Sequence, residues 1–299
     1  MEINLIGVPI YYGCDKKGVE DGPKVLRENK IVSILESDKN EVYDLGDIYI
    51  DNSIERQAFK NGVNAKYIDE IVSINTNLAH KVYSALCSGG FPLVIGGDHA
   101  LAAGSISGVA KYFREDLAVI WVDAHGDMNT FETSPSGNVH GMPLAALFGV
   151  GDKCLTDIYF KGVKVKKENV FVIGARDLDM GELDLINEFG LNVWTMDRIK
   201  EIGVGGVCIE LYKCLEKNGI KNIHLSFDID SIDPSIMKGT GTPVEDGLNM
   251  DEAKVILNRI FETRLVKSMD FVEFNPQLDK SGETTKRCIE IMETLKTLI

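Results

Sequence analysis

The sequence has no excess of positive charge and no long apolar run. Its 299 residues include 32 basic and 46 acidic ones, which gives a net charge of −14. Nucleic-acid binding requires a clustered basic face, so this balance argues against a nucleic-acid partner. No apolar run approaches the roughly 20 residues of a membrane span, and we expect no membrane segment. The acidic balance favours solubility, and it would also suit a cationic substrate.

Paired cysteines and a targeting signal are also missing. The six cysteines form no Cys-x-x-Cys pair, and in a chain of this length they are typical of reduced, mostly buried thiols. The N-terminal stretch MEINLIGVPI has no basic residues ahead of its apolar part, unlike a signal peptide. These features predict a cytoplasmic protein.

The chain alternates between short apolar runs and amphipathic segments. The runs are rich in Val, Ile and Phe, as expected for parallel strands that helices cover on both faces. We predict strands over 3–8, 91–95, 117–122, 170–173, 192–196, 224–228 and 266–273. Helical spacing predicts helices over 65–87, 205–217, 251–263 and 283–298. No linker or repeat interrupts this pattern, so residues 1–299 are expected to form a single α/β domain, an open, mostly parallel sheet with helices on both faces.

One predicted strand end carries three potential metal ligands. Asp123, His125 and Asp127 stand at alternate positions directly after the apolar run 117–122. Residues two apart in an extended strand point to the same side, so these side chains should leave the strand in one direction. Carboxylate and imidazole groups together suit a divalent ion such as manganese, zinc, iron or nickel.

Two further strand ends offer similar side chains. Asp228 and Asp230 lie at the end of one predicted strand, and His99 follows another. In open α/β sheets, ligands bind outside the carboxyl ends of the strands. Six ligands are more than one tetrahedral ion needs, so we predict a dinuclear metal site that activates water. The histidines inside predicted elements, His80 and His224, are instead expected to be ordinary surface or core residues.

Four motifs occur in a fixed order along the chain. They are GGDHA, VDAHGDMNT with SGNVHG, SFDIDSIDPS with GTGTP, and MDFVEFNP. Together they resemble the ureohydrolase family, which includes arginases and agmatinases, and the resemblance covers almost the whole chain. It implies an arginase-like fold, two Mn²⁺ ions per subunit and a homo-oligomer, either a trimer or a hexamer.

The resemblance also implies how the metal ligands are shared. One ion would be held by His99, Asp123, Asp127 and Asp228. The other would be held by His125, Asp123, Asp228 and Asp230. Asp123 and Asp228 would thus bridge the ions. A hydroxide between two cations exists at neutral pH, and it would attack the planar carbon of a guanidinium group to give urea and an amine.

A loop and a helix start are implied to recognise the substrate. Asn129, Ser136 and Asn138 match the residues with which arginases bind the α-carboxylate of L-arginine. Asp179 matches the residue that binds the α-ammonium group, and Glu182 matches a neighbouring glutamate. The alternative for the first three is a polar surface loop. We expect substrate contacts, because binding residues concentrate on loops held by a rigid scaffold.

Three residues are implied to act in catalysis. Glu273 would pair with the guanidinium group, and His140 would shuttle a proton to the leaving amine. Asp127 would relay a proton from the hydroxide. Thr242 resembles a residue that lines the site and would hydrogen-bond Glu273, although a turn threonine explains it nearly as well. Gly126 replaces a threonine common in the family, at a position that is not a ligand.

These observations predict hydrolysis of the small molecule L-arginine to L-ornithine and urea. The alternative is an agmatinase or another enzyme that hydrolyses a guanidino compound. A non-catalytic member of the family is a third interpretation, but such proteins usually lose metal ligands, and here every ligand position is filled.

Overall fold

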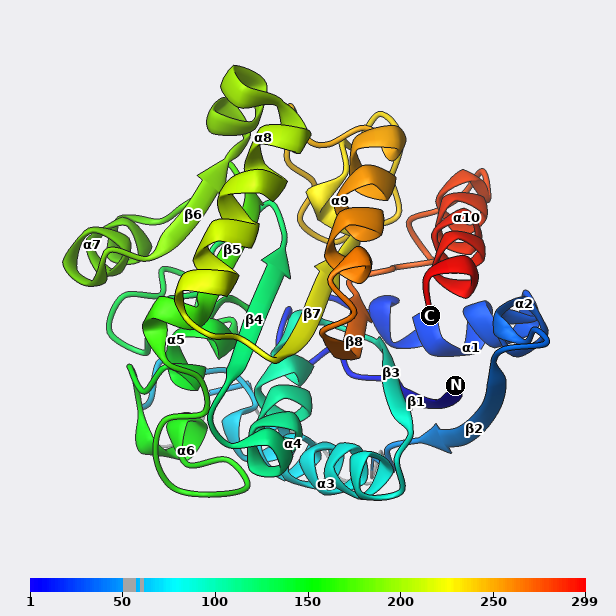
Figure 1. The fold of residues 1–299 in the computed structure, drawn as a ribbon. Coiled ribbons are helices and arrows are strands. Elements are labelled where there is room, and N and C mark those ends of the chain that lie inside the picture. Colours follow the sequence, from blue (N-terminus) through cyan, green and yellow to red (C-terminus); the bar gives the residue numbers. More distant parts are fainter. Residues whose placement is uncertain (51–57, 60–61) are drawn as a thin grey trace.

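Eight parallel strands form one sheet in the computed structural model, which describes residues 1–50, 58–59 and 62–299. The strand order is β2-β1-β3-β8-β7-β4-β5-β6 (Figure 1). The strands are β1 (Glu2–Val8), β2 (Glu41–Asp47), β3 (Phe91–Gly96), β4 (Leu117–Val122), β5 (Val170–Ala175), β6 (Asn192–Thr195), β7 (Asn222–Asp228) and β8 (Val266–Val272). This architecture confirms the predicted open, parallel α/β sheet.

Helices cover both faces of this sheet (Figure 1). In the described residues they are α1 (Gly22–Glu28), α2 (Ile31–Leu35), α3 (Ile68–Cys87), α4 (Ala102–Phe113), α5 (Pro143–Leu147), α6 (Lys153–Thr156), α7 (Met180–Phe189), α8 (Met196–Lys217), α9 (Met250–Glu262) and α10 (Glu283–Leu298). Short 3-10 helices occupy η1 (Val19–Asp21), η2 (His99–Leu101), η3 (Val139–Gly141), η4 (Lys167–Asn169) and η5 (Ile229–Ser231). No described helix has both the length and the apolar character that crossing a membrane requires.

Alternating residues of the strands pack into different layers. Ile120 of β4 belongs to the core beneath α1, α2, α8, α9 and α10. Its neighbours Val119 and Trp121 face the opposite layer, where α4, α5 and α7 pack. Because both faces are covered, every residue of β3, β4 and β5 is buried. This explains why these strands read as continuous apolar runs.

The sequence prediction missed β2 and the helices α1, α2, α4, α5, α6 and α7. β2 and α4 were missed for opposite reasons. β2 is an edge strand with mostly exposed side chains, and its sequence EVYDLGD contains no apolar run. α4 is buried from Ala102 to Ala110, so its small residues show no polar face and no helical period. The predicted helix over 205–217 also begins earlier, at Met196, and bends at Gly203, where φ is 71°.

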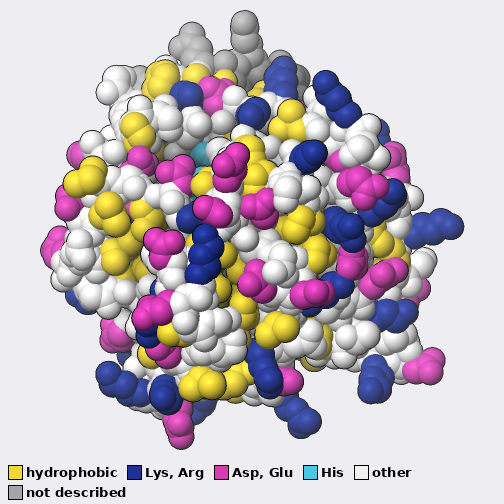
Figure 2. Space-filling model, turned by 90° about the horizontal axis from the view of Figure 1, so that it is seen from above, with side chains coloured by type: hydrophobic (Ala, Val, Ile, Leu, Met, Phe, Trp, Pro, Cys, Tyr) yellow, Lys and Arg dark blue, Asp and Glu magenta, His cyan; other side chains and the backbone are white. Residues whose placement is uncertain are grey.

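The strands that carry the metal-ligand motifs are neighbours in space. β3, β8, β7 and β4 lie side by side, so the segments that follow their carboxyl ends meet at one edge of the sheet. Figure 2 views the molecule from the side towards which these strands point, and acidic side chains lie near the histidine visible there.

Candidate metal centre and active site

The first group of potential ligands surrounds His99. Its Nδ1 lies 2.9 Å from Asp123, 3.1 Å from Asp127 and 3.2 Å from Asp228, measured to a carboxylate oxygen of each. The opposite nitrogen, Nε2, is hydrogen-bonded to the hydroxyl of Ser226 at 2.8 Å. Nδ1 itself is buried and forms no hydrogen bond of good geometry. A ring nitrogen that faces carboxylates while a second residue holds the other nitrogen is the usual arrangement of a histidine ligand.

Trp121 fixes the orientation of two of these side chains. Its indole stacks on the His99 ring, with 3.9 Å between ring centroids and 8° between planes. Its Nε1 donates a hydrogen bond of 2.9 Å to Asp123 Oδ2. Trp121 and Asp123 are two residues apart at the end of β4 and therefore face the same side. The end of β4 thus supplies a potential ligand, Asp123, and also Trp121, the side chain that orients it.

The second group of potential ligands surrounds His125. Its Nδ1 lies 3.3 Å from Asp123 Oδ1 and 3.1 Å from Asp230 Oδ2. Asp123 faces His99 with one oxygen and His125 with the other, so it belongs to both groups. In each of the two groups, His99-Asp123-Asp127 and Asp123-His125-Asp230, the ligand atoms lie within 4.8 Å of one another.

The buried carboxylates of these groups repel one another. Burial and the neighbouring charge of Asp123 raise the pKa of Asp127 to about 6. Burial and nearby carboxylates also raise the pKa of Asp228 and Asp230. Burial opposes the charge of Asp123 as well, but the neighbouring imidazoles of His125 and His99 outweigh it and lower the pKa of this carboxyl.

Such a cluster is unfavourable without compensating positive charge. Carboxylate oxygens and imidazole nitrogens are donors that manganese and similar ions accept. The unpartnered Nδ1 of His99 and the carboxylate shared between the groups therefore fit a pair of divalent cations.

The backbone is left-handed at two of the predicted catalytic residues. φ is 51° at Asp127 and 65° at Glu273. This conformation costs a non-glycine residue about 1 kcal/mol and persists only where the surroundings fix it. Here the carbonyl of Asp127 accepts a hydrogen bond from the Leu144 amide, and the amide of Glu273 donates to the Gly97 carbonyl, each at 2.9 Å. Both carboxylates are thereby held towards the site.

His140, which is partly exposed, pairs with the buried carboxylate of Glu273. His140 Nδ1 lies 3.0 Å from Glu273 Oε1, which also accepts the backbone N–H of His99 at 2.9 Å. Burial disfavours a charged His140, but the hydrogen bond and the charge of Glu273 prevail and raise the pKa of His140 to about 9. The second oxygen of Glu273, Oε2, is buried and has no hydrogen-bond partner.

A cavity of about 110 Å³ lies over the potential metal ligands. All six residues that were predicted to contact substrate line it: Asn129, Ser136, Asn138, Asp179, Glu182 and Thr242. His140, His125, Asp127, Asp228 and Asp230 line it too, whereas Glu273 does not line it but contacts His140, which does. The structure therefore brings the predicted residues together, and their roles remain predictions.

Hydrogen bonds hold the predicted substrate residues in place. Asn129 Nδ2 donates to Asp179 Oδ2 at 2.8 Å. Asn138 Nδ2 donates to the carbonyl of Cys14 at 3.1 Å, while its Oδ1 is buried without a partner. The Ser136 hydroxyl accepts the backbone N–H of Asn138 at 3.1 Å. These contacts preorganise the polar groups that face the cavity.

Glu182 links the start of α7 to the metal-ligand loop. One of its oxygens accepts the N–H of Met128 and the other accepts the N–H of Asp179, both at 2.9 Å. Burial raises the pKa of Glu182 to about 7. A Cβ atom at Gly126 would lie 2.8 Å from Glu182 Oε1. The glycine that departs from the family pattern therefore leaves room for this carboxylate.

Thr242 has a different partner from the predicted one. Its hydroxyl donates to Asp230 Oδ2 at 3.1 Å, and not to Glu273. The loop that carries Thr242 is anchored nearby by Arg176, whose guanidinium donates to the carbonyls of Asp230 and Val244 at 2.7 and 2.8 Å. Thr242 therefore holds the carboxylate of Asp230, a potential metal ligand, in position.

Several residues of the site were not predicted from the sequence. Ser226 and Trp121 hold His99, Arg176 ties two loops together, and Ser134 and Asp177 line the cavity. Alternation along a strand was the signal that could have found the first two, because each stands two residues before a predicted ligand. No local signal identifies the loop residues, whose place depends on the tertiary structure.

Known proteins resemble this chain over almost its full length. A family model described as the arginase family matches residues 1–296. The arginase of Brevibacillus brevis is 43% identical over 293 residues, which cover 98% of this chain and 97% of that protein. The native structure of arginase from Bacillus caldovelox superposes with a TM-score of 0.93 at 40% identity, covering 98% of this chain and 97% of that one. A structure of Entamoeba histolytica arginase in complex with L-ornithine gives a TM-score of 0.88 at 32% identity, covering 98% of each chain.

These matches exceed what a shared fold alone would give, and they agree with the two ligand groups at the edge of the sheet. The chain belongs to the arginase family.

Proposed function

We propose that this protein is an arginase that hydrolyses L-arginine to L-ornithine and urea with two Mn²⁺ ions. The observation that carries the proposal is the position of Asp123, which is shared by two ligand groups at the floor of a cavity lined by residues suited to α-amino acid groups. The relatives support it, since those reported above are arginases and one was described with L-ornithine.

The proposed metal ligands follow from the two groups. His99, Asp123, Asp127 and Asp228 would hold one ion. His125, Asp123, Asp228 and Asp230 would hold the other. When bound, the ions would supply Lewis-acid activation of the attacking water. Asp228 faces His99 with Oδ2 and accepts the backbone N–H of Asp230 at 2.7 Å with Oδ1. Its bridging role rests on the family resemblance, because that second contact is to the backbone and not to a ligand atom.

The remaining side chains would orient the substrate. The free Oε2 of Glu273 is the buried acceptor that a guanidinium group could satisfy. At the other end of the cavity, Asp179 would attract the α-ammonium group, with Glu182 beside it. The hydroxyl and amide groups of Ser136, Asn138 and Asn129 would bind the α-carboxylate. Thr242 would line the site and keep Asp230 in place.

His140 and Asp127 would handle protons. The pKa of His140, about 9, means that its imidazole carries a proton at neutral pH as long as Glu273 remains paired with it. Because His140 lines the cavity, it could give that proton to the leaving amine. Asp127 would accept the proton from the attacking water.

The first test compares two substrates. Manganese-loaded protein should release urea from L-arginine and little from agmatine, which lacks the α-carboxylate. Urea from agmatine alone would overturn the assignment of the α-carboxylate loop while leaving the metal site intact. Urea from neither would contradict the proposed activity.

A second test addresses the α-group contacts. Asp179→Asn keeps a side chain that can cap α7 but removes its charge, and Asn129→Ala removes the amide. We expect each to raise KM for L-arginine about tenfold, as loss of a hydrogen bond to a charged group implies, with unchanged manganese content by atomic absorption. Asp184→Ala, on the exposed side of the same helix, is the control. Equal losses of manganese and arginine affinity would contradict the assignment.

We also propose, from the family resemblance, that the protein is a cytoplasmic homo-oligomer, either a trimer or a hexamer. Sedimentation velocity of the purified chain tests the assembly, and a monomer at micromolar concentration would exclude it.

A further inference from the structure

A second and larger cavity lies at the edge of the sheet opposite the metal ligands. Its volume is about 530 Å³, within the range of small-molecule sites. It is lined by Phe91 and Val266, the first residues of β3 and β8, whereas the ligand motifs follow the far ends of the strands. The two cavities share no lining residue.

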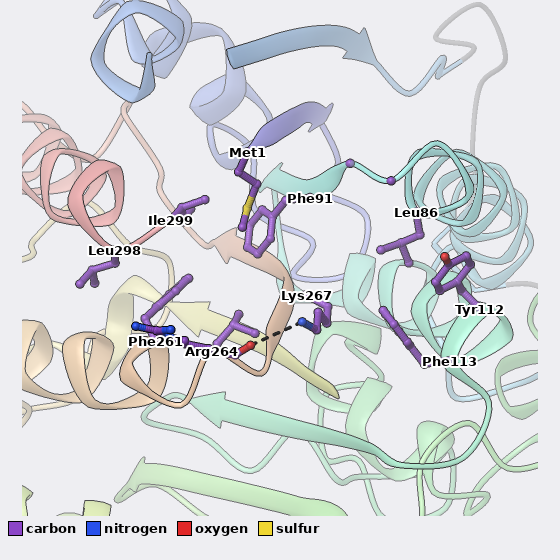
Figure 3. Close-up of a pocket in the computed structure, with 13 residues that line it drawn as sticks. Met1, Leu86, Phe91, Tyr112, Phe113, Phe261, Arg264, Lys267, Leu298 and Ile299 are labelled. Atoms are coloured by element: carbon purple, nitrogen blue, oxygen red, sulfur yellow. Dashed lines mark hydrogen bonds between the residues drawn. The ribbon is translucent and has the colours of Figure 1, made fainter. Parts of the chain in front are cut away.

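The walls of this cavity are mainly apolar. Side chains come from the carboxyl ends of four helices: Leu86 of α3, Phe113 of α4, Phe261 of α9 and Leu298 of α10. Figure 3 shows these walls around Phe91, with Lys267 between the α4 side and the α9 side. An apolar hollow of this size favours an apolar ligand body.

Positive charge is concentrated at this cavity. Arg264 and Lys267 line it, and none of its thirteen lining residues is an aspartate or a glutamate. This is unusual in a chain with 46 acidic and 32 basic residues. Within the described residues, neither cation forms an ion pair with a carboxylate, and the Lys267 ammonium donates a long hydrogen bond of 3.4 Å to the Arg264 carbonyl.

The carboxyl ends of the helices oppose this positive charge, but their effect on the cavity is weaker. A helix carboxyl terminus carries a partial negative charge of roughly half a unit, whose effect fades within one turn. The carboxylate of Ile299 and the ammonium of Met1, which also line the cavity, offset one another, and the two full positive charges of Arg264 and Lys267 outweigh the partial charges of the helix ends. The net preference is therefore for an anion.

We propose that this cavity binds a small amphipathic anion. Its apolar body would lie against Phe91, Phe261 and Leu298, and its carboxylate or similar head would face Arg264 and Lys267. This site is independent of the proposed hydrolysis of L-arginine, because it lies at the other edge of the sheet.

Calorimetric titration of the full, manganese-loaded chain tests the proposal with three ligands of equal chain length. Octanoate is the anionic probe, octylammonium the cationic one and octan-1-ol the neutral one. We expect octanoate to bind at least about tenfold more tightly than octylammonium, with octan-1-ol between them. Equal affinity for octanoate and octylammonium would refute the role of the two cations.

Charge-removing variants locate the binding site. Arg264→Gln and Lys267→Gln should each weaken octanoate binding about threefold, and the double variant about tenfold, as expected for partly exposed ion pairs. Lys213→Gln, which removes a charge from exposed α8 surface, is the control and should bind octanoate normally. The carboxylate of octanoate could also reach the metal centre, but binding there would be unaffected by the Arg264 and Lys267 substitutions, and that result would overturn the proposal.

A second copy of this chain is the other candidate for covering the cavity. Sedimentation velocity of the wild type and of the double variant distinguishes a small anion from a second copy of the chain as the occupant of the cavity. If the double variant dissociates an oligomer that the wild type forms, and octanoate does not bind to the wild type, the cavity is an interface between copies and the proposal fails. Unchanged assembly together with the loss of octanoate binding supports it.

Discussion

At the scale of single residues, Asp123 has the largest number of roles in the site. Its two oxygens face different histidines, and one of them also accepts the indole N–H of Trp121. Oδ2 serves His99 and Trp121 and Oδ1 serves His125, so both carboxylate oxygens are in use.

Asp123→Asn should therefore reduce manganese binding at both positions and not at one. An amide keeps the size of the side chain but loses the charge and one acceptor oxygen, and loss of a ligand charge at a shared position weakens both ions. We expect fewer than one bound ion per chain by atomic absorption after dialysis, and a loss of urea release.

Asp116→Asn is the control for this variant, because Asp116 pairs with Lys221 at the surface. Retention of two ions and of activity in Asp123→Asn would exclude the bridging role of this carboxylate.

Glu182 should make the metal-free protein less stable as pH rises. Its pKa is about 7 in the folded chain and about 4.5 in the unfolded chain. A carboxyl whose pKa is raised by folding contributes stability that is complete below pH 4.5 and is lost as the pH passes through 7. The shift corresponds to roughly 3 kcal/mol. Glu182→Gln should remove this loss, so its free energy of unfolding relative to wild type should improve between pH 4.5 and 8.

Urea unfolding at pH 5 and pH 8 measures this difference. Glu252→Gln is a matched control, because Glu252 occupies the same capping-box position in α9. A pH dependence for Glu182→Gln identical to that of wild type would contradict the attribution to this carboxyl.

At the scale of elements, alternation along the strands made much of the site predictable. The ligands after β4 and β7 stand two residues apart, and this spacing identified Asp123, His125, Asp127, Asp228 and Asp230 together. The fold class was equally accessible, because fully buried strands produce apolar runs. Thr242 and Glu273 show where this prediction fails. Both were predicted to belong to the site, but the hydrogen bond predicted between them is absent, and Thr242 bonds Asp230 instead. The geometry of this loop depends on anchors distant in sequence, such as Arg176.

A buried cluster of polar side chains joins β7 and β8, and the register of these two strands brings its members together. His224, predicted to be an ordinary core or surface residue, is fully buried. Its Nδ1 bonds the Ser268 hydroxyl at 2.8 Å, and its Nε2 lies 3.1 Å from Asp270 Oδ2. The same oxygen of Asp270 accepts the Ser105 hydroxyl of α4 at 2.5 Å. This group ties a helix to two strands without touching the cavity.

Asp270→Ala should destabilise the protein by roughly 2–4 kcal/mol. The substitution leaves His224 and Ser105 buried without their shared partner, and an unsatisfied buried polar group costs about 1–3 kcal/mol. Urea denaturation measures the change, and Asp116→Ala at the surface should cost much less. A loss below about 0.5 kcal/mol for Asp270→Ala would show that water or rearrangement replaces the contact.

At the scale of the whole molecule, distant parts of the chain share one sheet. β1 lies between β2 and β3, and β8 lies between β3 and β7. α10, the last helix, packs near α1 and α2 (Figure 1). We propose on this basis that residues 1–299 form a single domain.

Metal removal should therefore destabilise the whole molecule and not only the site. The proposed ligands follow β3, β4 and β7, so the ions would link three strands. Binding to the folded state alone stabilises it by about 2.7 kcal/mol at a free metal concentration of 100 times Kd. We expect EDTA to lower Tm in one cooperative transition and added Mn²⁺ to restore it. An unchanged Tm, measured by calorimetry with and without EDTA, would exclude this linkage.

The position of β8 in the middle of the sheet sets an order of events during synthesis. β4 and β7 are direct neighbours, so the ligands of the His125 group can meet as soon as both strands have left the ribosome. β3 pairs with β8 and not with β7, so the strand that precedes His99 joins the rest of the sheet through β8 only after residue 272 has been added. We expect the nascent chain to assemble one ligand group well before the other, and contacts this distant in sequence to slow the last step of folding.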